Sequence, residues 1–183
     1  MGYTHYYTAQ REFDATEWHE ICSFTRHMLS HLPPYSTSAG GVYADEAIKI
    51  VGWRGEAGTA PEIKSELIAF NGEGPNGHES FVIYRSPENE WLNDDPFLFC
   101  KTAGKPYDLV VCALLLAILE IAPGALAVSS DGDMQGSEWE PAREWLKELG
   151  TVDNLREAGQ IAIEVNDATP PAWWPAEWEI PPL

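Results

Sequence analysis

A short segment ahead of the most apolar stretch of the chain concentrates groups that bind anions. Residues 101–106 read Lys-Thr-Ala-Gly-Lys-Pro and hold two of the eleven Lys and Arg residues. Free backbone N–H groups and the helix dipole favour negative charge where a helix begins, so Lys101, Thr102 and Lys105 are candidate ligands of an anion. The segment is not a Walker A motif, because Pro106 stands where that motif needs Ser or Thr. A capped helix start, with its lysines paired to carboxylates, explains the same residues, and both interpretations stay open.

Aromatic side chains at the N-terminus extend this candidate site. On a strand, Tyr3, His5 and Tyr7 share one face and Tyr6 lies on the other. Either ring stacking on a base or ordinary strand packing accounts for them. With Tyr107, which follows the basic segment, they complete the predicted ligand-binding set.

A second pattern matches the opening of a calcium-binding loop. Asp131, Asp133 and Gln135 supply oxygen donors at positions 1, 3 and 5. The twelfth position is Ala142, which cannot supply the bidentate carboxylate of such a loop. The pattern therefore favours a plain turn, with Ca²⁺ as the weaker alternative and no other cofactor expected.

Two further groups could do chemistry but lack a partner in the sequence. His27 and His31 have the i, i+4 spacing of a metal clamp, yet no third ligand accompanies them. Cys100 could form a nucleophile pair with His5 or His78, although a cysteine next to apolar residues is more often part of the core. No catalytic residue is predicted.

The elements that must position these residues alternate between strands and helices. Asp14 is a plausible N-cap for a helix whose apolar side carries Trp18 and Ile21, with Arg26 on its polar side. The stretch around residues 109–119 is apolar all round, which predicts a central, buried helix. The expected strands are residues 3–8, 47–53, 62–71, 79–85 and 125–129, and the expected helices are residues 15–32, 106–122 and 141–149.

These elements predict an α+β fold. We expect a mixed or mainly antiparallel sheet of about four to five strands, packed with two to three helices. Residues 1–150 would form a single domain, and residues 151–183, rich in Pro and Trp, an extension packed on it.

Charge and cysteine content limit the function classes. The net charge is −18, from 29 acidic and 11 basic residues, which argues against direct nucleic-acid binding over a large face. The longest apolar run has eleven residues, whereas a membrane span needs about 20. Three cysteines without CxxC spacing argue against a disulfide framework. Together with the lack of a signal-peptide pattern, this predicts a cytoplasmic protein of a bacterial host cell.

Several sequence segments together resemble a family of small, uncharacterised bacteriophage and prophage proteins. They are MGYTHY at residues 1–6, FCKTA at 99–103, KPYDLVVC at 105–112, SSDG at 129–132 and EWEPAR at 138–143. The resemblance covers residues 1–149 and implies a phage setting but no activity.

Three functions follow as hypotheses. The first is a phage accessory protein that binds, and so sequesters, a small anionic ligand of the nucleotide type. The second is an acidic mimic of DNA that inhibits a host nucleic-acid-binding protein. Its charge is, however, spread along the chain rather than concentrated in one stripe. The third is a small hydrolase centred on Cys100 or on Asp131 and Asp133.

Overall fold

The computed structural model describes residues 3–34, 46–88 and 96–150. Within them, three helices and seven strands form an α+β fold, which confirms the predicted class. The predicted extension at residues 151–183 lies outside the described residues.

The first sheet has three antiparallel strands with the N-terminal strand in its middle. Strand β1 (Thr4–Ala9) pairs on one side with β6 (Phe97–Lys101) and on the other with β7 (Leu126–Ser130). Tyr6 lies opposite Phe99 on β6 and opposite Ser129 on β7. The sheet therefore joins segments that are about a hundred residues apart in the chain.

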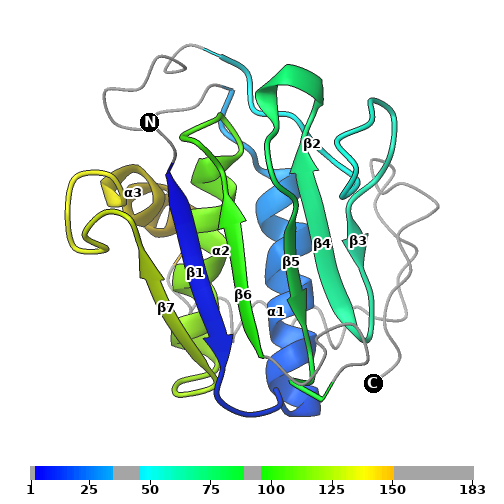
Figure 1. Cartoon of the computed structure of the whole chain (residues 1–183), viewed down its shortest axis with the longest axis vertical. Coiled ribbons are helices and arrows are strands. Elements are labelled where there is room, and N and C mark those ends of the chain that lie inside the picture. Colours follow the sequence, from blue (N-terminus) through cyan, green and yellow to red (C-terminus); the bar gives the residue numbers. More distant parts are fainter. Residues whose placement is uncertain (1–2, 35–45, 89–95, 151–183) are drawn as a thin grey trace.

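The second sheet is built around β4 (Leu67–Gly72). Its partners are β5 (Phe81–Tyr84), β2 (Ile50–Val51) and β3 (Glu62–Ile63), all antiparallel to it. A short 3₁₀ helix, η1 (Gly74–Asn76), lies in the turn between β4 and β5. Next to β5, the Glu79 amide donates to the Lys101 carbonyl at 3.2 Å, so the two sheets lie side by side as one layer (Figure 1).

The three described helices lie on one face of this layer, and no described helix lies on the other, which we name the open face (Figure 1). Helix α1 (Ala15–Ser30) begins with a capping box. The side chain of Asp14 accepts from the Glu17 amide, and the side chain of Glu17 accepts from the Asp14 amide. Helix α2 (Asp108–Ile121) is nearly all buried, as its apolar sequence predicts, and packs against α1 and α3 (Glu140–Leu149). No helix in the described part of the chain is both long and apolar enough to cross a membrane.

The sequence-based predictions need several corrections: β6 was not among the expected strands, and β2 spans only Ile50–Val51 of the expected residues 47–53. The strand expected over residues 62–71 is two strands, β3 and β4, because the Lys64 amide donates to the Leu67 carbonyl and turns the chain back. Helix α2 begins at Asp108 rather than Pro106, since a turn closed by the Asp108 amide and the Lys105 carbonyl precedes it. Arg26, expected on the polar side of α1, is buried, and its Nη2 donates to the Ile63 carbonyl at 2.9 Å.

Candidate functional site

The predicted basic segment forms a tight connection from β6 to α2. The amides of Thr102 and Ala103 both donate to the Tyr3 carbonyl at 3.0 Å, which fixes the end of β6 to β1. Ala103 and Gly104 then adopt left-handed backbone conformations, with φ of +54° and +65°. These two residues reverse the chain so that α2 starts directly behind the sheet.

The N-terminus of α2 is already supplied with hydrogen-bond acceptors. The Asp108 amide donates to the Lys105 carbonyl, and those of Val110 and Val111 donate to the Tyr107 carbonyl. The first turn also carries an anion of its own, the buried Asp108 carboxylate. An external anion would therefore be held by lysine side chains. The sequence had instead suggested the free amides at the helix start as ligands.

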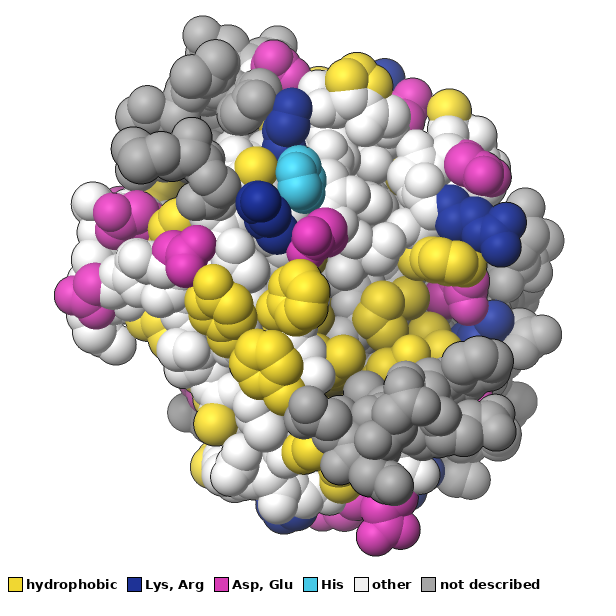
Figure 2. Space-filling view, viewed as in Figure 1, with side chains coloured by type: hydrophobic (Ala, Val, Ile, Leu, Met, Phe, Trp, Pro, Cys, Tyr) yellow, Lys and Arg dark blue, Asp and Glu magenta, His cyan; other side chains and the backbone are white. Residues whose placement is uncertain are grey.

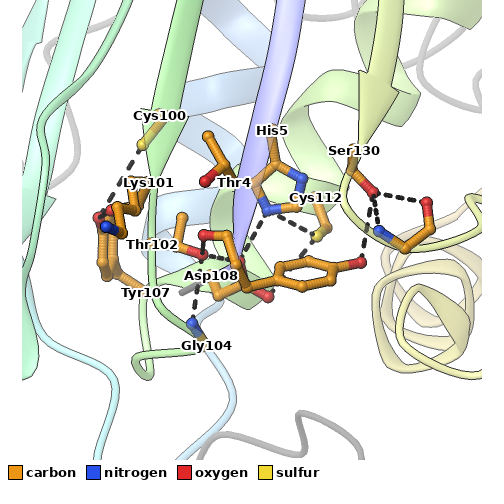
Figure 3. A network of polar contacts seen from close by, with 12 residues as sticks. Thr4, His5, Cys100, Lys101, Thr102, Gly104, Tyr107, Asp108, Cys112 and Ser130 are labelled. Atoms are coloured by element: carbon orange, nitrogen blue, oxygen red, sulfur yellow. Dashed lines mark hydrogen bonds and ion pairs between the residues drawn. The ribbon is translucent and has the colours of Figure 1, made fainter. Parts of the chain in front are cut away.

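Behind the sheet, four buried side chains form a polar group that we name the buried cluster: His5, Thr102, Asp108 and Cys112 (Figure 3). His5 Nε2 lies 2.7 Å from Asp108 Oδ1, and the Thr102 hydroxyl donates to the same oxygen. Cys112 Sγ lies 3.7 Å from His5 Nε2 and 3.8 Å from Asp108 Oδ2. The cluster links β1, the loop after β6, and the first turn of α2.

Aromatic rings enclose the imidazole of this cluster. Tyr3 and Trp139 both meet His5 edge to face, with ring centroids 5.2 and 5.1 Å away. Trp139 Nε1 donates to the Tyr3 hydroxyl at 3.1 Å. Among the described residues, His5 Nδ1 has no hydrogen-bond partner. A buried polar atom without a partner costs about 1–3 kcal/mol.

The thiols of the chain lack the character of nucleophiles. Burial raises the pKa of Cys100 to about 12, and it raises the pKa of Cys112 well above its ordinary value. The Cys100 thiol lies 3.4 Å from the Glu79 carbonyl. Cys112 and Asp108 share one nitrogen of His5, whereas a catalytic relay needs the nucleophile and the carboxylate on opposite ring nitrogens. The raised pKa of the Cys100 thiol thus disfavours a hydrolase centred on Cys100, and the shared ring nitrogen disfavours a relay through Cys112.

On the open face of the sheet, three aromatic side chains form what we name the aromatic patch: Tyr6, Phe97 and Phe99. Phe97 is 45% exposed and Phe99 is 53% exposed. The ring of Tyr6 stacks on Phe97 with centroids 6.2 Å apart, and the Phe97 and Phe99 centroids are 6.3 Å apart. Figure 2 shows this face with hydrophobic side chains grouped at its centre.

Basic groups lie at one end of the aromatic patch. Lys101 follows Phe99 by two residues on β6, which places it on the same face about 7 Å further along. Lys105 Nζ donates to the Pro75 carbonyl at 2.9 Å, which brings η1 to the same end of the sheet. Figure 2 shows two basic side chains, a histidine and an acidic side chain next to the hydrophobic group. A Glu79 carboxylate oxygen accepts from the Lys101 amide at 2.9 Å, so the open face combines flat rings with charged side chains of both signs.

The structure separates the predicted ligand-binding residues. Tyr3, His5 and Thr102 belong to the buried cluster or its surroundings, whereas Lys101 lies on the open face. Tyr7 and Tyr107 are buried, and their hydroxyls donate to the carbonyls of Val82 and Glu79.

The acidic residues of the predicted calcium loop accept hydrogen bonds from neighbouring backbone and side-chain groups. Asp131 accepts hydrogen bonds from the Thr4 amide and the Tyr6 hydroxyl, at 3.0 and 2.9 Å. Asp133 Oδ1 accepts from the Gln135 amide at 2.9 Å, which is the geometry of an Asx turn. The carboxylate of Asp131 therefore anchors β1 to the end of β7.

Sequence reasoning missed four residues of these sites: Phe97, Phe99, Asp108 and Cys112. The alternation of Phe97, Phe99 and Lys101 along one strand was a usable signal for the open face. No local pattern could have brought His5 to Asp108, since 103 residues separate them.

No protein-family model, curated protein or solved structure matches the chain. The resemblance to small phage proteins therefore stays a prediction.

Proposed function

We propose that the protein binds a small anionic ligand of the nucleotide class on the open face of its sheet. The observation that carries the proposal is the aromatic patch on β1 and β6 with Lys101 at its end. Exposed aromatic rings on a sheet stack on nucleic-acid bases, and each stacked base contributes about 1–3 kcal/mol.

The spacing of rings and charge suits a ligand with one base and a phosphate. Phe99 would stack on the base, and Lys101 would contact the phosphate at the end of the strand. Lys105, beside η1, adds a second positive charge at this end. Since a net charge of −18 repels further phosphates, a mononucleotide or dinucleotide fits better than a polymer.

Binding without chemistry agrees with the buried, high-pKa thiols and the lack of a catalytic relay in the described residues. In the phage setting that the resemblance implies, such a protein would sequester a nucleotide of the infected host cell.

Calorimetric titration with nucleoside mono- and diphosphates, and with the matching nucleosides, tests this proposal. Phe99→Ala should weaken binding of both ligand types about tenfold, because the stacking surface is lost. Phe99→Leu keeps an apolar side chain but removes the flat ring, so it should weaken binding nearly as much. Lys101→Ala should weaken binding of the phosphates and leave the nucleosides unaffected.

Lys147→Ala is the matched control, because this exposed lysine lies on α3, away from the open face. It should bind like the unmodified chain. The proposal would be wrong if the folded protein bound none of these ligands at millimolar concentration. It would also be wrong if Phe99→Ala and Lys101→Ala bound them with unchanged affinity.

A further inference from the structure

Three different metal-ligating atoms converge in the buried cluster. The imidazole nitrogen of His5, a carboxylate oxygen of Asp108 and the sulfur of Cys112 all lie within 4.8 Å of one another. Asp108 and Cys112 are one turn apart on α2, a spacing that directs both side chains to the same side of a helix. His5 faces them from β1 (Figure 3).

The distances between these three ligand atoms are close to those in a tetrahedral zinc site. Bond lengths of about 2.0–2.3 Å place tetrahedral donors about 3.3–3.5 Å apart. The sulfur of Cys112 lies 3.7 Å from the nitrogen and 3.8 Å from an oxygen, within reach of these values. The nitrogen and the nearer oxygen are 2.7 Å apart, and they would separate by about 0.6 Å around an ion.

We propose that His5, Asp108 and Cys112 bind a divalent cation of the zinc type. A mixed set of nitrogen, oxygen and sulfur donors suits Zn²⁺ and excludes a preference for Ca²⁺ or Mg²⁺, which take oxygen ligands. The Thr102 hydroxyl, which donates to Asp108, would orient the carboxylate from outside the ligand set. This inference is independent of the proposed function on the open face.

A bound cation would change the electrostatics of the cluster. Burial and the Asp108 charge raise the pKa of the Cys112 thiol, and a coordinated metal would instead deprotonate it. The ion would join the middle strand of the first sheet to the first turn of α2, so binding should also stabilise the fold.

Cobalt substitution tests the site on the full chain, purified without a histidine tag. Co²⁺ should bind in a 1:1 ratio and show the d–d absorption of a tetrahedral ion together with a sulfur-to-cobalt charge-transfer band. Zn²⁺ should displace it, and mass spectrometry of metal content should find one retained zinc per chain. Removing the metal with a chelator should lower the Tm.

The cysteines of the chain supply matched variants. Cys112→Ser should lose the charge-transfer band and the retained zinc. The double variant Cys22→Ala/Cys100→Ala leaves Cys112 as the only thiol and should keep the charge-transfer band and the retained zinc. It tests the site even if Cys112→Ser fails to fold. The proposal is overturned if the folded, unmodified chain retains no metal and gives no sulfur band, or if the double variant loses the band while folded.

Discussion

At the scale of single residues, Asp108 connects the helix, the loop and β1. Its carboxylate accepts from His5 and from Thr102, and all three side chains are buried. Removing it leaves two buried polar groups without their partner, whereas an amide of the same shape still offers one oxygen.

We therefore expect Asp108→Ala to lower the free energy of unfolding by roughly 3 kcal/mol, and Asp108→Asn by clearly less. Urea unfolding with a chelator present, to exclude metal effects, measures both values. A free energy of unfolding for Asp108→Ala within about 0.5 kcal/mol of the parent would show that the cluster has no role in stability.

The thiols make a second prediction at this scale. Burial raises the pKa values of Cys22 and Cys100 to about 12 and that of Cys112 well above its ordinary value. At pH 8 the folded protein should therefore react only slowly with a thiol reagent, since the thiolate is the reactive form. Rapid modification of one thiol in the native state would contradict this prediction and revive the nucleophile hypothesis. All three should react after unfolding in urea.

At the scale of elements, the connection between β6 and α2 positions both candidate sites. It holds Lys101 at the end of the open face and places Asp108 in the buried cluster. Its reversal depends on two left-handed residues, of which only Gly104 is suited to that conformation.

Gly104→Ala should lower the free energy of unfolding by about 1 kcal/mol. A Cβ at this position would meet no atom within 4 Å, so the cost comes from the backbone alone. Ala103→Gly is the matched change. Glycine removes the strain of the left-handed conformation in the folded state, but it also raises the conformational entropy of the unfolded chain, and the two effects offset each other. It should leave stability nearly unchanged. Equal losses for both variants, in thermal or urea unfolding, would refute this account of the loop.

Most of the helices and strands could be predicted from the sequence, because caps, prolines and apolar periodicity are local signals, but β6 was not among the expected strands. Asp14 predicted the start of α1, and the apolar run predicted a buried α2. Pairing could not be predicted, since β1 joins β6 and β7 across long stretches of chain. That pairing places Tyr3 and His5 on one side of the sheet and Lys101 on the other. The candidate sites could therefore not be located from the sequence alone.

At the scale of the whole molecule, the charge of −18 restricts what the open face can bind. In our proposal Lys101 and Lys105 would neutralise a phosphate locally, whereas the negative charge of the rest of the chain would repel each further phosphate. Affinity should therefore rise little from a mononucleotide to a single-stranded ten-mer.

Fluorescence anisotropy with labelled oligonucleotides at 50 and 200 mM salt measures this dependence. A true nucleic-acid-binding protein would bind the longer strand much more tightly, with a steep loss of affinity in salt. That outcome would show that the ligand is a polymer, contrary to our proposal.

The most direct test of the central claim locates the ligand on the molecule. We would record NMR spectra of the labelled protein while adding a nucleoside monophosphate. Signals of Tyr6, Phe99 and Lys101 should shift together with one dissociation constant, while those of the buried face of α1 stay in place. Shifts confined to the helical side, or no shifts at millimolar ligand, would contradict a nucleotide site on the open face of the sheet.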